Sequence, residues 1–231
     1  MQINTEEALK THYEQIWSNG ELAEELEYYK WALSLFSPKP GDTLLDIACG
    51  AGYFLREAEK SGLKCTGLDI SENALAKARQ LCKETRFYQG NAEKLPFSDS
   101  SFHLVSCLGS VEHFLNPVKA LLEMKRVLKP EGMLSICVPN LYFERIRNLL
   151  AGVAHSQERE TFYTLEQAVK LIEKDGKLRV IKVFPFNPSG KKHIQQKNFK
   201  MLNKLIVSAY KLVSKYIPLK LSYSFVFLCR K

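Results

Sequence analysis

The stretch TLLDIACGAGYF, residues 43–54, joins a run of mostly apolar residues to a glycine-containing turn. Its first six residues are typical of a buried strand, and we expect a helix to begin at about Tyr53. Gly50 and Gly52 allow the backbone to approach a ligand closely, and the start of the helix offers free N–H groups. In a parallel α/β sheet such a turn lies at the carboxyl ends of the strands, where ligands bind.

Strand and helix patterns alternate downstream of this turn. Ser71 and Asn116 are suitable N-caps for two of the expected helices, and Pro-Glu-Gly at 130–132 predicts a turn before the fifth strand. The alternation predicts a doubly wound, mostly parallel α/β sheet. The expected strands are 43–48, 64–70, 86–90, 102–109 and 133–139, and the expected helices are 53–61, 72–82 and 117–128.

The flanking segments complete a seven-stranded Rossmann-like sheet with N-terminal helices and an insertion after the fifth strand. Residues 5–36 look helical, with a break at Asn19-Gly20, and Thr164 and Gln167 form a capping-box pattern that opens a helix to about 174. We expect an N-terminal helical cap and one cofactor-binding domain with two lid or insert segments. Their bounds are 1–40 for the cap, 41–231 for the domain, and 140–163 and 185–220 for the inserts. Further expected elements are helices 142–151 and 198–217 and strands 177–184 and 222–230.

Composition indicates a soluble cytoplasmic protein. No run of 18 apolar residues appears, the polar N-terminus does not resemble a signal peptide, and the six cysteines are scattered. We therefore expect reduced thiols and neither a zinc site nor a required metal. Charge is divided unevenly: residues 140–231 hold 18 basic and six acidic side chains, whereas residues 1–139 hold 15 and 19. This division favours an anionic partner, although lysines that only keep a face solvated would look the same.

Asp69 lies nineteen residues beyond Gly50, at the end of the second expected strand. A carboxylate there is placed to accept hydrogen bonds from both hydroxyls of a ribose. The pairing occurs in NAD enzymes as well as in methyltransferases, so it indicates a ribose-bearing ligand and not yet a reaction. The glycine spacing, A-x-G-x-G followed by Tyr53, differs from the dinucleotide fingerprint G-x-G-x-x-G and disfavours NAD.

Four segments, in order, resemble the motifs of class I S-adenosylmethionine-dependent methyltransferases, in particular the broad small-molecule, type 11-like group. They are LLDIACGAGYFL (44–55), GLDIS (67–71), GNAEKLPFSDSSFHLV (90–105) and VLKPEGMLSICVPN (127–140). The resemblance implies S-adenosylmethionine as the cofactor and transfer of its methyl group to an acceptor (EC 2.1.1).

The resemblance also implies residue roles. The backbone of the first motif would face the methionine part, Asp46 would fix the loop and the amino group, and Asp69 would hold the ribose. Ala48 stands where glycine is usual, which a methyl group satisfies if φ is negative, and Asn91 replaces a usual aspartate whose acceptor role its amide can keep. The implied cofactor-binding set is Asp46, Ala48, Cys49, Gly50, Gly52, Asp69, Ile70, Asn91, Ala92 and Leu108.

Catalysis needs little beyond placement, because the sulfonium methyl is already activated and an in-line nucleophile can displace it. A base is needed only where the acceptor must lose a proton. His113 and Glu112, just past the fourth strand, are the catalytic candidates, with His155 a weaker one; His113 could equally be a packed residue. Ser110, and Tyr13 and Trp17 of an N-terminal segment that in the family folds over the cofactor, are candidates for the substrate pocket.

We predict methyl transfer to a small-molecule or lipid-like acceptor, either anionic or lipophilic. One alternative is a non-catalytic cofactor-binding module that acts through its basic C-terminal surface. Another is an RNA methyltransferase; an Asn/Asp-Pro-Pro-aromatic motif is absent after the fourth strand, which disfavours methylation of a base amino group. The expected helix 198–217 has lysines on one side and apolar residues on the other. It could pack on the sheet with its lysines in water, lie on an anionic membrane surface or form a platform for RNA.

Overall fold

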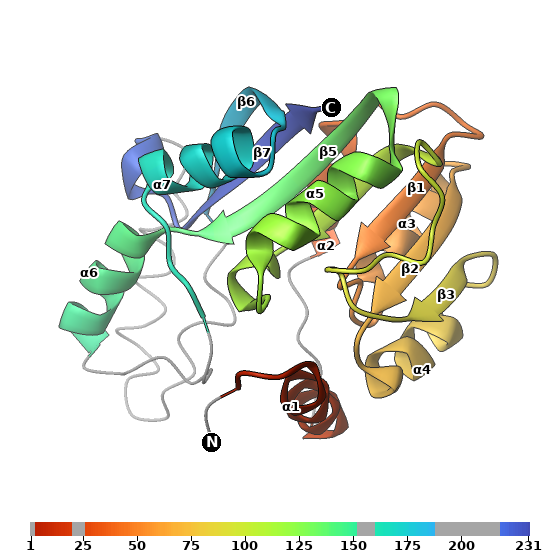
Figure 1. Cartoon of the computed structure of the whole chain (residues 1–231), viewed down its shortest axis with the longest axis horizontal. Coiled ribbons are helices and arrows are strands. Elements are labelled where there is room, and N and C mark those ends of the chain that lie inside the picture. Colours follow the sequence, from red (N-terminus) through yellow and green to blue (C-terminus); the bar gives the residue numbers. More distant parts are fainter. Residues whose placement is uncertain (1–2, 20–25, 152–159, 188–217) are drawn as a thin grey trace.

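The structure, a computed structural model of the 231-residue chain, describes residues 3–19, 26–151, 160–187 and 218–231. Its centre is one seven-stranded sheet in the order β3-β2-β1-β4-β5-β7-β6 (Figure 1). The expected helix 198–217, His155, and much of the two expected inserts lie outside the described residues. The strands are β1 Thr43–Ile47, β2 Lys64–Asp69, β3 Arg86–Gln89, β4 Phe102–Leu108, β5 Leu128–Pro139, β6 Arg179–Phe186 and β7 Ser224–Arg230.

Strand direction divides the sheet into two parts. β1 to β5 pair in parallel, and β7 runs antiparallel between β5 and β6. The strand order reverses between β1 and β4, so that β1 leads outward to β2 and β3 while β4 leads to β5. The predicted doubly wound, mostly parallel sheet is therefore confirmed, and its carboxyl edge at β1 and β4 is where a ligand is expected.

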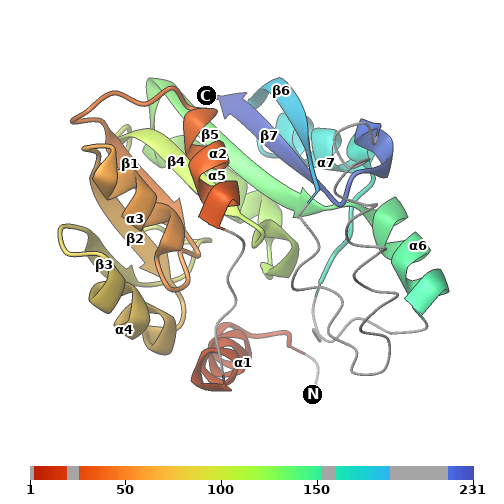
Figure 2. The ribbon, with the colours of Figure 1, turned by 180° about the vertical axis from the view of Figure 1, so that it is seen from behind.

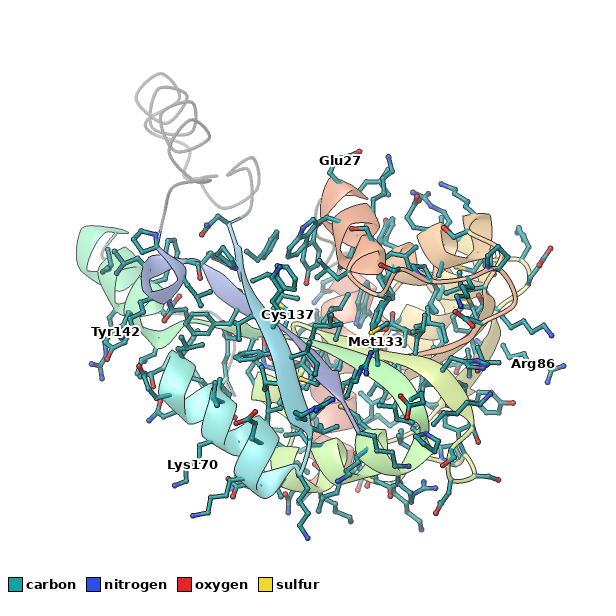
Figure 3. All side chains as sticks on the ribbon, turned by 90° about the horizontal axis from the view of Figure 1, so that it is seen from above. Glu27, Arg86, Met133, Cys137, Tyr142 and Lys170 are labelled. Carbon is teal, nitrogen blue, oxygen red and sulfur yellow. The ribbon has the colours of Figure 1, made fainter. Side chains whose placement is uncertain are left out.

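Helices cover both faces of the sheet (Figure 2). On one face α2, α3 and α4 pack against side chains such as Leu44, and on the other α5 and α7 pack against side chains such as Leu45. Because neighbouring residues of a strand point to opposite faces, each face of the sheet has its own apolar core. Cys137 of β5 lies in the middle of the molecule, and Lys170 points outward (Figure 3). The helices are α1 Glu6–Asn19, α2 Leu26–Ser34, α3 Tyr53–Lys60, α4 Glu72–Leu81, α5 Pro117–Val127, α6 Leu141–Ala151 and α7 Leu165–Lys170, with shorter turns η1 Val111–His113, η2 Leu171–Asp175 and η4 Leu219–Leu221.

The predicted helix starts are confirmed by their hydrogen bonds. The Ser71 hydroxyl accepts from the N–H of Ala74, and the side-chain amide oxygen of Asn116 accepts from the N–H of Lys119. Thr164 and Gln167 form a reciprocal capping box. Each cap satisfies backbone donors that the first turn of a helix leaves without partners, so the sequence fixes where these helices begin.

Two boundaries differ from the prediction. Residues 130–132 lie inside β5, and its pairing with β4 shifts in register between Phe102 and Leu104. The expected helix to residue 174 ends at Lys170 and continues as the π-helical turn η2. None of the described helices is long and apolar enough to span a membrane.

Candidate cofactor and acceptor site

The turn after β1 is tied to the end of β2 by two backbone donors. The N–H of Cys49 donates to the carbonyl of Leu68 at 3.1 Å, and the N–H of Gly50 donates to Oδ2 of Asp69 at 2.8 Å. The other carboxylate oxygen, Oδ1, accepts from the N–H of Ser71 at 2.9 Å. Asp69 thus joins the β1 turn to the start of α4, and its position at the carboxyl end of β2 is the predicted one.

Backbone conformation at this turn corrects one expectation. We expected Ala48 to replace the usual glycine with a negative φ. This expectation is wrong, because Ala48 has a φ of 56°, in the left-handed region. Gly50 and Gly52 also have positive φ, of 53° and 80°. A Cβ at Gly50 would lie 2.8 Å from the ring of Trp17, so both the conformation and the close approach require glycine there.

Two buried carboxyl groups lie beside the glycine turn, Asp46 within the first motif and Asp69 at the end of β2. Asp46 of β1 accepts a hydrogen bond from the hydroxyl of Ser106 on β4 at 2.7 Å. Burial raises its pKa to about 7, against the lowering effect of that hydrogen bond. Burial likewise raises the pKa of Asp69 to about 6, although the N–H groups of Ser71 and Gly50 lower it. Both groups are therefore costly to charge until a ligand supplies more donors.

The remaining cofactor candidates lie along the same carboxyl edge. Asn91 follows β3, and its side-chain oxygen Oδ1 accepts from the N–H of Glu93 at 2.9 Å. This bond closes a tight turn and does not involve the side-chain amide N–H groups of Asn91. Ala92 is buried in the core, whereas Ile70 and Leu108 are half-buried at the ends of β2 and β4.

Helix α1 lies beyond the carboxyl ends of the parallel strands in both views (Figures 1 and 2). Trp17 packs against the glycine turn, and Tyr13 meets the ring of His113 edge-on at 6.0 Å. Glu14 holds the helix in place at the N-terminus of α4, where the Ser71 hydroxyl donates to it at 2.9 Å. The N–H groups of residues 72 and 73 donate to the same carboxylate, at 2.7 and 3.0 Å. Residue-type patterns did not identify Glu14 as part of the site.

The acceptor candidates gather at η1, directly after β4. Glu112 and His113 are buried, with 3.9 Å between Oε1 and Nε2, and burial raises the pKa of Glu112 to about 8. Ser110 is half-buried at the start of the turn. Glu160, which the sequence analysis missed, offers a carboxylate oxygen within 4.8 Å of both candidate side chains. Nothing in the sequence indicated a role for Glu160 beyond its position in the expected insert 140–163.

A second group of rings lies at the β6–β7 side of this edge. Ser224 pairs with the last residues of both β5 and β6, Pro139 and Phe186, so that Phe186 stands at the carboxyl edge. Its ring lies 4.1 Å from that of Tyr28 on α2. The other rings of this group, each in contact with a further member, are Trp31, Phe184, Tyr223 and Phe143. The edge is thus polar near β1 and β4 and aromatic near β6.

Comparison with known proteins gives consistent results. A family model described as a methyltransferase domain matches residues 45–136. A demethylmenaquinone methyltransferase of Chlorobaculum parvum is 36% identical over 129 residues, 52% of this chain and 54% of that protein, so the matched part spans about half of the relative's length. One of Bacillus cereus is 30% identical over 188 residues, 68% of this chain and 79% of that protein.

A solved structure shares the fold at low identity. An S-adenosylmethionine-dependent methyltransferase from Mesorhizobium loti superposes with a TM-score of 0.65 at 17% identity. The match covers 90% of this chain and the whole of that one. At this identity the likeness supports the arrangement of the sheet and helices alone.

Proposed function

Because the chain belongs to the class I S-adenosylmethionine-dependent methyltransferases, we propose that it transfers the methyl group of that cofactor to a small, lipid-like acceptor with an aromatic ring. The cofactor occupies the carboxyl edge between the β1 turn and Asp69. The acceptor enters from the side of η1 and the aromatic group.

The observation that carries the proposal is the position of Asp69. Its two oxygens accept from the N–H groups of Gly50 and Ser71, which orients the carboxylate at the edge of the sheet, and lone pairs of the carboxylate remain for a ligand. A ribose diol can donate to those lone pairs from a ligand that lies across the glycine turn. The fixed turn supplies the close backbone approach that the methionine part needs.

The acceptor class is inferred from chemistry and from relatives. The rings at the β6–β7 side pack on one another and on the core of the α2 face, which makes this end of the carboxyl edge apolar, as an aromatic, lipid-like acceptor requires. The two relatives described above carry the name demethylmenaquinone methyltransferase, which denotes an acceptor of this kind. An RNA acceptor would instead call for a basic surface, and the basic residues between 191 and 215 fall outside the described residues.

The reaction is an in-line displacement. A nucleophilic atom of the acceptor forms a bond to the methyl carbon while the carbon–sulfur bond breaks, and its electron pair stays on sulfur to give S-adenosylhomocysteine. The acceptor loses a proton, which passes to water. Placement supplies much of the rate, so the chain needs chiefly to hold the two reactants in line. Glu112 and His113 are the proposed catalytic residues, where a polar group of the acceptor meets the protein.

Calorimetric titration with S-adenosylhomocysteine, with NAD as the competing ligand, tests the cofactor. Labelled S-adenosylmethionine with a prenylated naphthoquinol, and separately with a short RNA, tests the acceptor. We expect binding of S-adenosylhomocysteine alone and label in the quinol alone. Binding without product from any acceptor would favour a non-catalytic module, and label in RNA would replace the proposed substrate class.

Asp69→Asn is the matched variant for the cofactor site. It keeps the size of the side chain but turns one acceptor oxygen into a donor, so we expect at least about a hundredfold loss of S-adenosylhomocysteine affinity. Asp42→Asn is the control, because Asp42 also accepts from a backbone N–H, that of Lys39 at 2.8 Å, but before β1 at the opposite end of the strand. Equal affinities in the two variants would contradict the assignment of Asp69.

A further inference from the structure

Three potential metal ligands come together on the acceptor side. Glu112, His113 and Glu160 each offer one ligand atom, and these atoms lie within 4.8 Å of one another. Two ligands of a single ion, each about 2.1 Å from it, lie up to about 4.2 Å apart. The 3.9 Å between His113 Nε2 and Glu112 Oε1 falls in that range, and the atom of Glu160 lies no more than 4.8 Å from either of the other two ligand atoms.

Glu112 gives an independent indication of a ligand. Its side chain is 5% exposed, and its Oε2 has no hydrogen-bond partner among the described residues. Glu57 is buried to a similar degree, 6% exposed, but it is paired with Lys60 and Arg56. A buried carboxylate oxygen without a donor is costly, so the difference between the two residues requires a cause at Glu112.

The backbone fixes the three groups relative to one another. Glu112 and His113 are neighbours in η1, which follows β4 at the carboxyl edge. The N–H of Thr161 donates to the carbonyl of Glu112 at 3.0 Å, so the segment that carries Glu160 lies directly on this turn. Tyr163 is bonded to the end of β5 and the start of α6, which holds the far end of the same segment.

We propose that Glu112, His113 and Glu160 bind a divalent transition-metal cation, of which Mn²⁺ and Zn²⁺ are the natural examples. Two carboxylates and one imidazole are a donor set that these ions accept. Three protein ligands leave coordination positions open to water or to an oxygen of the acceptor. A coordinated acceptor hydroxyl loses its proton to water more readily, so the ion prepares the nucleophile while Glu112 and His113 hold it.

Local charge agrees with a cation. The donor set holds two carboxylates, Glu112 and Glu160, against at most one positive imidazole, that of His113. A bound dication balances these carboxylates and gives Oε2 of Glu112 a partner.

The spacing along the chain explains why we expected no required metal. Glu112 and His113 are adjacent, and Glu160 lies beyond α5, β5 and α6, so no short ligand pattern exists in the sequence. The fold alone brings the third ligand to the other two. The structure therefore points to a metal where composition and spacing gave no sign of one.

Titration of the metal-free full chain with MnCl₂, followed by the electron paramagnetic resonance of free Mn²⁺, tests the site without cofactor or acceptor. We expect saturable uptake of one ion per chain and its displacement by Zn²⁺. Glu112→Gln and Glu160→Gln should each weaken Mn²⁺ binding by about 10- to 100-fold. Circular dichroism of each variant confirms that the fold is kept.

Glu57→Gln is the control for loss of a buried carboxylate and should bind Mn²⁺ as the unaltered chain does. Uptake that does not saturate at millimolar Mn²⁺, or equal affinity in the Glu112→Gln and unaltered chains, would overturn the site. Titration of the same samples with S-adenosylhomocysteine separates this inference from the proposed function. If the chain binds S-adenosylhomocysteine but not Mn²⁺, the metal site is contradicted and the proposed function stands. If the chain binds Mn²⁺ but not S-adenosylhomocysteine, the proposed function is contradicted and the metal site stands.

Discussion

Ala48 adopts a left-handed backbone conformation at the turn of the proposed cofactor site. A residue with a Cβ pays about 1–2 kcal/mol in that region, whereas glycine does not. Ala48→Gly should therefore raise the free energy of unfolding by about 1 kcal/mol, after the extra entropy of glycine in the unfolded chain is included. Urea denaturation followed by circular dichroism measures the change.

Ala58→Gly is the control for this substitution. Ala58 lies in the interior of α3, fully buried, where glycine should lower the free energy of unfolding by at least about 1 kcal/mol. Opposite signs for the two variants are the expected result. A loss of stability in both would show that Ala48 is not strained by its φ.

As the proposed ribose acceptor, Asp69 is expected to make cofactor affinity depend on pH. Burial raises its pKa from 3.8 to about 6, so the folded chain holds the proton more tightly than the unfolded chain. Its contribution to stability is therefore complete below pH 3.8 and is lost as pH rises through about 6. The ribose hydroxyls need the charged carboxylate, so affinity should change in the opposite direction.

The expected affinity for S-adenosylhomocysteine falls by up to about tenfold per pH unit below the pKa of Asp69, and the titration of Asp46 near pH 7 adds a separate, smaller change above it. Calorimetry between about pH 5 and about pH 8 measures the profile. Asp69→Asn should bind weakly at every pH and show no such slope. A profile of the unaltered chain that is flat across this range would contradict a charged Asp69 as the ribose acceptor.

At the scale of elements, Glu14 attaches α1 to the N-terminus of α4. Although partial burial raises the pKa of Glu14, the backbone donors of Asn73 and Glu72 lower it overall, as expected for a cap. Glu14→Ala removes all three bonds to its carboxylate and should lower the free energy of unfolding by about 1–2 kcal/mol. It should also increase cleavage within residues 6–19 in limited proteolysis.

Glu7→Ala provides the matched control on the same helix, because Glu7 is exposed in the first turn. It should leave the cleavage rate within about twofold of the unaltered chain, since exposed substitutions cost little. If Glu14→Ala and Glu7→Ala are cleaved at the same rate, Glu14 does not hold α1 at the site.

Elements set by local rules could be predicted from the sequence. Strand periodicity and side-chain caps at Ser71, Asn116 and Thr164 depend on neighbours in the chain, and all appear in the structure. Residues 130–132, predicted as a turn, are assigned to β5, but they lie where its pairing with β4 is interrupted: Leu128 pairs with Phe102 and Met133 with Leu104. A Cβ at Gly132 would lie 2.8 Å from the carbonyl of His103, so this glycine serves close strand approach.

The same distinction applies to the site. Asp69 and the glycine turn belong to one β–α–β unit, β1-α3-β2, whose length sets their spacing, so the sequence alone suggests them as site residues. Glu14, Ser106 and Glu160 reach the site from distant elements by tertiary contacts, and no local pattern marks them. Residues that reach a site through tertiary contacts are therefore the part of it that cannot be predicted from a single sequence.

At the scale of the molecule, the carboxyl edge is where separately stabilised parts meet. Each face of the sheet has its own core, and α1 adds a third small cluster around Trp17. A ligand across the β1 turn contacts residues that belong to more than one of these parts. Ligand binding should therefore stabilise these parts together and raise the free energy of unfolding of the whole chain.

Thermal unfolding with S-adenosylhomocysteine tests this coupling. A ligand at about 100 times its Kd adds about 2.7 kcal/mol to the folded state. For a chain of this size that corresponds to a rise in Tm of about 5–10 °C. NAD at the same concentration should show no rise, and the Asp69→Asn chain should show a rise of at most about 1–2 °C. Because α1 closes the same edge, the ligand should also slow proteolysis within residues 6–19 in the unaltered chain. A rise in Tm with no protection of α1 would mean that the ligand binds the sheet without the helix, and Trp17 would then not line the cofactor site.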